Sequence, residues 1–258
     1  MIQILLTVFF GLFLIATGAG ILGALLGIGG GVIIVPVLVL AGYNIQEAAA
    51  ASIIAVIGTS TAAAAVYTRD QYTNLRLAMF LEIATTLGAI TGSFLAFSLP
   101  KAFLMTILGI VLLYVSIQMY IFRPSPEKKS LTKKDPLSKY LRLEGSYQDP
   151  VTKEEINYSV KHVLPIFGIS GIAGILSGML GIGGGVIKVP ALNLIGGINM
   201  RIAAATSNFM IGVTAATTAF LYFREGFVNL FLILPLTLGI LLGASAGSKL
   251  STRLRTTT

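Results

Sequence analysis

A ten-residue apolar motif occurs twice in this chain, and this repeat limits the fold more than any other feature. Residues 27–36 read GIGGGVIIVP and residues 181–190 read GIGGGVIKVP, so nine of the ten positions are identical. Both copies lie inside long apolar stretches. Broken backbone at the depth of a bilayer is tolerated only where protein buries it or where it lines a wet cavity. Paired broken segments in the two halves of a membrane protein indicate a transport site.

The composition excludes an ordinary soluble domain. Charged residues make up only 11% of the sequence and hydrophobic residues 55%, whereas about a quarter of the residues in a soluble domain are charged. The first charged residue is Glu47, and one helical crossing needs only about 20 apolar residues. The opening stretch can therefore hold two passages. It has neither a basic n-region nor a cleavage site before polar sequence, so a signal peptide is not expected.

The formal net charge of +8 is concentrated in one polar segment, which argues against a nucleic-acid partner. Nine of the 18 Lys and Arg residues fall between Arg123 and Lys161, and most of the others sit at the ends of apolar runs. The positive-inside rule describes loop charge of this kind. The chain has no cysteine and only one histidine, His162. We therefore expect no metal site and no cofactor, and we do not expect an enzyme.

The apolar segments divide the chain into two halves joined by a polar linker. We expect a first membrane repeat over residues 1–122, a linker over 123–161 and a second membrane repeat over 162–258. The expected membrane segments are 2–22, 27–42, 48–68, 75–97 and 102–122, then 163–180, 181–197, 203–223 and 228–246. The fold class is thus an all-α integral membrane protein with two homologous halves, each with a short or re-entrant glycine-broken segment.

The repeat continues well beyond the glycines, which indicates a duplication. Three further matched pairs lie 155 positions apart: Tyr67 with Tyr222, Arg69 with Arg224, and Asn74 with Asn229. The segment 102–122 has no counterpart after Ser251. The second half is therefore expected to lack its last span, either by truncation or because the family tolerates the loss.

The basic loop residues predict the topology. If all five segments of the first half cross, the linker, Arg76 and Arg201 share one side, whereas Lys101 and Arg224 lie on the other. The positive-inside rule then places the linker in the cytoplasm of a multi-pass cell-membrane protein. An odd number of crossings makes the halves inverted repeats. Short segments that only dip into the bilayer would make the halves parallel instead.

The linker shows signs of a structure of its own. Residues 130–139 are basic and are expected to be mobile, whereas 140–144 and 156–160 alternate polar and apolar residues as strands do. Asp149-Pro150 is a turn signal between them. We therefore expect a small β-hairpin, which serves either as a solvated tether between the halves or in regulation and partner binding.

The two glycine turns are the leading candidates for a binding site. Glycine adopts positive φ and lets a ligand approach the backbone, and a helix that begins after such a turn presents N–H groups and partial positive charge to an anion. The candidate residues are Gly27, Gly29, Gly30 and Gly31 with Gly181, Gly183, Gly184 and Gly185. The alternative is close helix packing, because both turns also have small-xxx-small spacing.

Two ionisable residues lie inside apolar stretches, where they are costly and functional by default. Lys188 replaces Ile34 in the second copy of the motif. It either balances an anionic substrate or extends its amine to an interface. Glu82 either couples transport to H+ or Na+ or has a structural partner such as Arg76 or Lys188.

Hydroxyl groups and small residues complete the set of motifs. The third long segment of each half is rich in Ser and Thr, and the side chains expected to hydrogen-bond a substrate are Ser52, Thr206, Ser207 and Asn208. Residues 18–23 fit the dinucleotide fingerprint GxGxxG, but they lack the strand–turn–helix context that it requires. We expect these glycines, together with the pairs Gly88/Gly92 and Gly243/Gly247, to serve helix packing.

At these residues the chain resembles the sulfite exporter TauE/SafE family, also called the TSUP transporters. The resemblance is carried by the doubled GIGGGVIxVP motif, by residues 204–208 and 212–216, and by the Tyr-x-Arg loops 67–74 and 222–229. Residues 141–147 resemble a subset of the family with an extended central cytoplasmic loop. The resemblance implies a polytopic permease for small sulfur-containing or carboxylate anions such as sulfite, thiosulfate or sulfonates.

We therefore expect a secondary transporter that alternates access around a central site. The expected partners are a small anion, the lipid bilayer, H+ or Na+ as coupling ion, and a second copy in a homodimer. The sequence has no Walker A motif, which argues against direct use of ATP. A passive anion channel and a non-transporting membrane sensor that uses the hairpin are the alternatives from sequence.

Overall fold

The computed structural model describes residues 2–69, 71–121, 135–148 and 155–253, and these are almost entirely helical. In chain order the elements are α1 (Ile2–Leu26), α2 (Gly31–Leu40), α3 (Ile45–Arg69), α4 (Leu75–Ser98), α5 (Lys101–Ile121), α6 (Pro136–Tyr140), β1 (Gly145–Gln148), β2 (Glu155–Tyr158), α7 (Val163–Leu180), α8 (Gly185–Pro190), the π-helix η1 (Ala191–Ile195), α9 (Met200–Arg224) and α10 (Leu230–Arg253). The expected all-α membrane fold is confirmed.

Six helices are long and apolar enough to cross a membrane: α1, α3, α4, α5, α7 and α10. The helix α9 is equally long, but the side chains that it buries include Thr206, Ser207, Asn208 and Thr214. It therefore buries a polar face in the protein, while Val213, Phe220 and Phe223 on the same helix are exposed. The two glycine-broken segments are much shorter. At about 1.5 Å per residue, α2 with 10 residues covers roughly half of a bilayer core that is about 30 Å thick.

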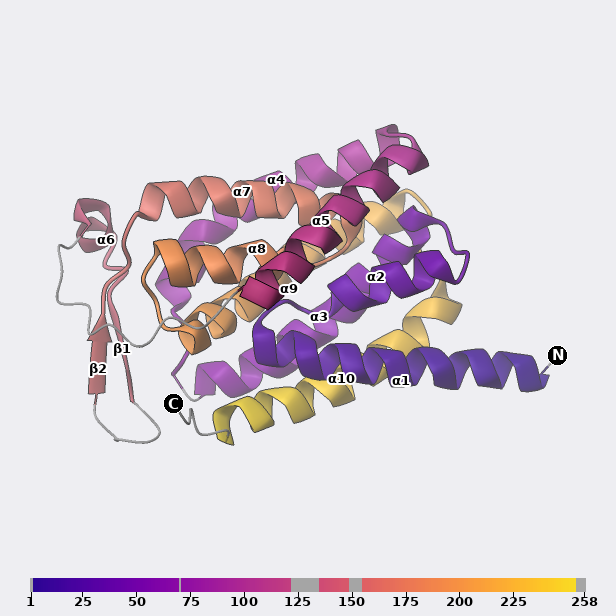
Figure 1. The fold of residues 1–258 in the computed structure, drawn as a ribbon, viewed down its shortest axis with the longest axis horizontal. Helices are drawn as coiled ribbons and strands as arrows, with labels where there is room; N and C mark the ends of the chain where they lie inside the picture. The colour runs from indigo at the N-terminus through magenta and orange to yellow at the C-terminus, as the bar shows by residue number, and fades with distance from the viewer. Residues whose placement is uncertain (1, 70, 122–134, 149–154, 254–258) are drawn as a thin grey trace.

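The first helix of each half packs along the fourth helix of the other half. α1 lies beside α10, and α4 lies beside α7 (Figure 1). A Cβ atom on Gly239, Gly243 or Gly247 would meet the backbone of Phe13, Thr17 or Ile21 in the same order. Both lists ascend along the chain, so α1 and α10 run parallel with their backbones in close contact, as small residues allow.

The α4–α7 pair repeats this arrangement. A Cβ on Gly88 would meet Gly171, and one on Gly92 would meet Ile175, again in ascending order. The prediction that Gly88/Gly92 and Gly243/Gly247 serve helix packing is confirmed. Gly20 of the fingerprint-like segment would place a Cβ 2.6 Å from the Ile240 carbonyl oxygen, so it too is a packing residue.

The matched helices α3 and α9 run in opposite directions. Near the end of α3, Tyr67 shares a core cluster with Ile202 and Ala203 from the start of α9. Tyr222, near the end of α9, shares the other cluster with Ala48 from the start of α3. These directions are the ones expected of inverted halves.

Two tyrosines mark the same relation in hydrogen bonds. The Tyr67 hydroxyl donates to the Ala24 carbonyl at 2.9 Å, and the Tyr222 hydroxyl donates to the Gly178 carbonyl at 3.0 Å. Ala24 and Gly178 occupy matched positions near the ends of α1 and α7. Each phenol thus ties α3 or α9 to the long helix of its own half, α1 or α7, that precedes the glycine turn.

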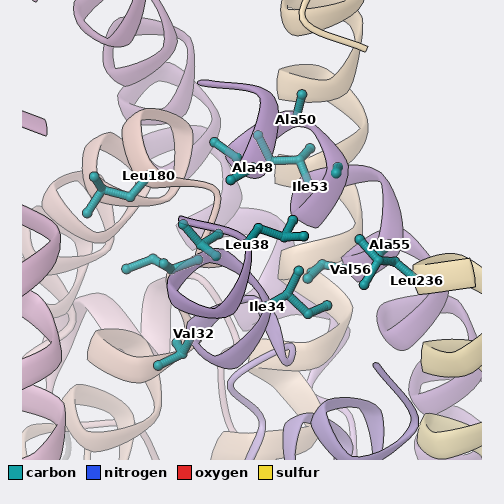
Figure 2. Packing of buried hydrophobic residues seen from close by; sticks show 14 of the residues in the cluster. Val32, Ile34, Leu38, Ala48, Ala50, Ile53, Ala55, Val56, Leu180 and Leu236 are labelled. Atoms are coloured by element: carbon teal, nitrogen blue, oxygen red, sulfur yellow. The ribbon is translucent and has the colours of Figure 1, made fainter. Parts of the chain in front are cut away.

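The short helix α2 is embedded in protein. Figure 2 shows Val32, Ile34 and Leu38 of α2 among Ile53 and Val56 of α3, with Leu180 and Leu236 contributed by α7 and α10. All of these side chains belong to one buried cluster. The glycine-broken backbone is therefore enclosed, which is one of the two conditions under which it can persist at membrane depth.

The linker contains the predicted hairpin, but its first strand lies later in the chain. β1 and β2 pair antiparallel, with Tyr147 opposite Ile156, whereas the strand predicted over 140–144 is wrong. Pro136 and an Asp135 N-cap begin a helical turn that runs through Tyr140, and Arg142 then adopts a positive φ of 50°. Residues 136–139 of the segment predicted to be mobile belong to α6; residues 130–134 and the turn signal 149–150 lie outside the described residues.

The hairpin is docked on one end of the bundle, opposite the end at which α1 begins (Figure 1). Leu143 and Val160 are fully buried against the helices. The Asn74 side-chain amide donates to the Leu143 carbonyl at 3.0 Å and to the Tyr158 hydroxyl at 3.1 Å. The described residues at and beside the hairpin therefore pack against the helices.

A carboxylate joins the two ends of the described linker. Asp135 accepts hydrogen bonds from the backbone N–H groups of Val163 at 3.0 Å and Leu137 at 3.0 Å. These bonds, above all that from Val163, stabilise the ionised form and lower the pKa of Asp135 below its usual value. The start of α6 is thereby fixed against the start of α7.

Candidate functional site

The two glycine turns cross each other in the interior of the protein. A Cβ on Gly31 would lie 2.6 Å from the Gly181 carbonyl oxygen and 2.8 Å from the Ser52 hydroxyl. A Cβ on Gly185 would meet the Gly27 carbonyl oxygen. We call residues 27–31 and 181–185 together the glycine crossing. The two turns therefore lie against each other, and the close backbone packing considered as an alternative from sequence is present here.

The backbone of each turn also requires glycine. The φ angles are 74° at Gly27, 85° at Gly29 and 83° at Gly30. The matched values in the second turn are 73° at Gly181, 83° at Gly183 and 66° at Gly184. Side chains with a Cβ rarely adopt this left-handed region. Gly31 and Gly185 begin the helices α2 and α8 instead, and they are small because the opposite turn is so close.

Serine hydroxyls hold the crossing together from the opposite half. Ser207 donates to the Gly27 carbonyl at 2.9 Å, and Ser52 donates to the Gly181 carbonyl at 2.7 Å. Thr59 adds a bond to the Gly29 carbonyl at 3.0 Å. The structure therefore places the predicted Ser52 and Ser207 at the glycine turns. In this conformation their hydrogens are donated to the turns themselves.

The remaining predicted hydrogen-bonding residues divide between two places. The Asn208 side-chain amide donates to the Ala24 carbonyl at 3.1 Å, close to the crossing. Its Oδ1 atom has no hydrogen-bond partner among the described residues. Thr206 accepts a bond from the backbone N–H of Asn74 at 3.2 Å, so its hydroxyl faces the start of α4 and is not brought to the glycine turns.

Lys188 lies one turn beyond the crossing and is completely enclosed. Its backbone N–H donates to the Gly184 carbonyl at 3.2 Å, and its side chain is only 1% exposed. Within the described part of the chain, its Nζ atom has no hydrogen-bond partner. The amine therefore does not extend to the protein surface in this structure. A buried ammonium without a hydrogen bond is costly, and an anion would satisfy it.

Glu82 faces the same region from α4. Its carboxylate accepts hydrogen bonds from Thr214 at 2.6 Å, from Thr86 at 3.0 Å and from Thr85 at 3.4 Å. Of the two structural partners considered from sequence, Arg76 is engaged elsewhere, because its guanidinium donates to the Arg142 carbonyl at 3.4 Å. Lys188 is buried like Glu82, and the elements that carry them, α8 and α4, both pack against α9.

The charged pair occupies only one of two equivalent positions in the duplicated fold. Lys188 of α8 corresponds to Ile34 of α2, and Glu82 of α4 corresponds to Thr237 of α10. Thr214, which bonds Glu82, corresponds to Thr59, which bonds a glycine turn. The scaffold is nearly symmetric, whereas the ionisable chemistry belongs to one side of it.

The sequence analysis did not connect the threonines around Glu82 with its carboxylate. Thr85 and Thr86 follow it at i+3 and i+4, where helix side chains meet, so this part of the signal was present in the sequence. Thr214 comes from α9, and its contact depends on how α9 packs against α4. The tyrosine caps, Tyr67 and Tyr222, were visible only as matched positions in the repeat.

The fold and the enclosed polar centre define a class of multi-pass α-helical membrane proteins with two related halves and paired broken helices. Within that class the chain belongs to the sulfite exporter TauE/SafE family, whose model matches residues 12–258. It is 25% identical over 249 residues to the "Probable membrane transporter protein YunE" of Bacillus subtilis (strain 168), a match that covers 93% of this chain and 87% of that protein. No solved structure matches this chain.

Proposed function

We propose that this protein is a secondary transporter of small sulfur-containing or carboxylate anions, such as sulfite, thiosulfate or sulfonates, in the cell membrane. Membership of the TauE/SafE family and the likeness to a probable membrane transporter support a permease. The paired broken helices support alternating access around the glycine crossing. The choice of anion rests on the family description and on the chemistry of the buried side chains.

The observation that carries the proposal is the Lys188 ammonium, which is 1% exposed and has no hydrogen-bond partner among the described residues. An anion bound there would form a charge-assisted hydrogen bond, which is roughly twice as strong as a neutral one. The glycine turns would contribute backbone N–H groups in the binding conformation. Ser52 and Ser207 would keep the crossing in shape by their bonds to the turn carbonyls.

The linker is proposed to face the cytoplasm. Its hairpin docks on Asn74 and close to Arg76, at the end of the bundle where α9 begins with Arg201. The opposite end carries Lys101 and Arg224. The basic linker and its neighbours make the hairpin end the more positive one, which is the cytoplasmic end by the positive-inside rule.

Binding to three forms of the purified protein in one detergent tests the role of Lys188. Lys188→Met keeps the apolar stem and removes the charge. It is expected to weaken binding of sulfite, thiosulfate or methanesulfonate by about tenfold to a hundredfold, or about 1.5–3 kcal/mol. Lys188→Arg keeps the charge and should lose less, although its planar head cannot take the same position.

Lys101→Met is the matched control, because Lys101 is exposed at the start of α5. It should bind the same anion as the natural protein does. Unchanged affinity in Lys188→Met, measured by titration calorimetry alongside an intact thermal transition, would remove Lys188 from the site.

A further inference from the structure

The buried charges of Glu82 and Lys188 balance each other. Glu82 is 8% exposed and Lys188 1% exposed, and the elements that carry them, α4 and α8, both pack against α9. Moving an ion from water into a low-dielectric interior is costly, and an opposite charge nearby offsets part of that cost. The site is therefore neutral as long as Lys188 is protonated, Glu82 is ionised and no further ion is present.

No other charged side chain within the described residues faces this pair. The helix α7, which packs along α4, has no ionisable residue. The titratable residues of α9 are Arg201, Tyr222 and Arg224, near its two ends, and Lys188 is the one ionisable residue of α8 and η1. On α4 itself the other charged residue is Arg76, in the first turn. If a charged ligand enters this interior, only a change in the protonation of Glu82 or Lys188 can compensate its charge among the described residues.

We infer that Glu82 takes up one proton for each monovalent anion that binds at Lys188, so that the protein is an electroneutral anion–proton cotransporter. This inference rests on the proposed function. An anion paired with Lys188 leaves Glu82 as an uncompensated buried carboxylate. A proton from the same aqueous side forms an O–H bond on Glu82 and restores neutrality. On the other side the anion leaves, that O–H bond breaks, and the proton leaves with the anion.

The hydroxyl groups around Glu82 fit both of its protonation states. The Thr214 hydroxyl lies 2.6 Å from the carboxylate and 3.0 Å from the Met210 carbonyl. The Thr85 hydroxyl lies 3.4 Å from the carboxylate and 2.7 Å from the Leu81 carbonyl. Each hydroxyl has one hydrogen and can accept as well. When Glu82 is protonated, the threonine hydrogens can turn to the helix carbonyls and a threonine oxygen can accept from the acid.

The asymmetry of the repeat sets the stoichiometry. The position equivalent to Lys188 is Ile34, and the position equivalent to Glu82 is Thr237. The duplicated scaffold could have carried two such pairs, but it carries one. One exchangeable carboxylate gives one proton per cycle.

Proteoliposomes loaded by a pH gradient test this inference. Methanesulfonate is the probe, because it keeps its single negative charge throughout the working pH range, and any effect of pH must then arise in the protein. With the outside more acidic by about 1.5 units, one-to-one cotransport should accumulate the anion by up to about thirtyfold, since each pH unit corresponds to a factor of ten. A dye inside the vesicles should report acidification in step with anion entry.

The variant Glu82→Gln keeps the shape of the side chain and removes its proton exchange. It should lose accumulation driven by the pH gradient, and its remaining flux should become sensitive to a membrane potential set with K+ and valinomycin. The matched control is Glu225→Gln, because Glu225 is exposed at the end of α9, and it should behave like the natural protein. Counterflow exchange of labelled for unlabelled methanesulfonate should persist in all three forms, because exchange needs no net proton movement.

The outcomes separate the two proposals. If the natural protein exchanges the anion but shows no proton entry, or if Glu82→Gln still accumulates methanesulfonate down the pH gradient, the proton role of Glu82 is wrong and transport stands. If the natural protein does not exchange methanesulfonate, sulfite, thiosulfate or acetate, the proposed function is wrong. The proposed coupling to protons is then wrong as well.

Discussion

The glycine crossing can be tested by comparing two glycines that share a backbone conformation but differ in their surroundings. Gly30 has a φ of 83°, and a Cβ there would lie 2.8 Å from the Ala19 carbonyl oxygen. Gly42 has a φ of 90°, and a Cβ there would meet nothing within 4 Å. Alanine at either position has to adopt the left-handed region. At Gly30 alone, it must also displace packed backbone.

The two costs can be separated in magnitude. A left-handed conformation costs an L-residue about 1–2 kcal/mol, so Gly42→Ala should lower the free energy of unfolding by about that amount. Forcing an extra carbon into a packed interior adds about 1–3 kcal/mol. Gly30→Ala should therefore be less stable than Gly42→Ala by about 1–3 kcal/mol. It should also reduce anion flux, because the added Cβ displaces packed backbone at the glycine crossing.

Reversible unfolding in mixed micelles, with sulfonate flux in proteoliposomes, measures both effects. Gly109→Ala provides a reference, because Gly109 lies within α5 with nothing within 4 Å of a Cβ and an ordinary φ; it should gain about 0.5–1 kcal/mol. Equal losses in Gly30→Ala and Gly42→Ala would refute the reasoning, because they would show that the backbone at the crossing can yield.

Two further predictions concern the tyrosine caps and the orientation of the linker. Tyr67→Phe and Tyr222→Phe should each lower the free energy of unfolding by about 1 kcal/mol, measured by the same unfolding titration. Tyr120→Phe should be neutral, because Tyr120 is 92% exposed. Unequal losses at Tyr67 and Tyr222 would argue against equivalent roles. In a cysteine-labelling experiment on intact cells, Lys139→Cys, next to the buried Ser138, should be shielded from impermeant thiol reagents and Lys101→Cys should react; the reverse pattern would invert the topology.

The sequence predicted the membrane segments well because their signals are local. For example, α7 has the predicted bounds of 163–180. Helix ends moved by a few residues where polar residues continue a helix. For example, α9 begins at Met200 because Asn199 caps it with a 2.8 Å bond to the Arg201 N–H.

The candidate site was only partly predictable, because its contacts join distant segments. Membrane depth and an unusual residue type identified Lys188 and Glu82. That both are buried in the same interior follows from the packing of α4 against α9 and α8 against α9, which periodicity does not reveal. The acceptors of the Ser52 and Ser207 hydroxyl groups could not be predicted from sequence either, since each acceptor lies more than a hundred residues away.

The pairing of α1 with α10 also sets the order in which the protein can be completed. Phe13 and Thr17 are synthesised more than 200 residues before their partners Gly239 and Gly243. At roughly 5–20 residues per second, the first helix waits on the order of ten seconds or more for its neighbour. During that interval it must be held by lipid, by the insertion machinery or by a chaperone. The insertion of α10 therefore completes the contact with α1, and a ribosome that stalls before α10 would leave an assembled pair, α4 with α7, beside an unpartnered α1.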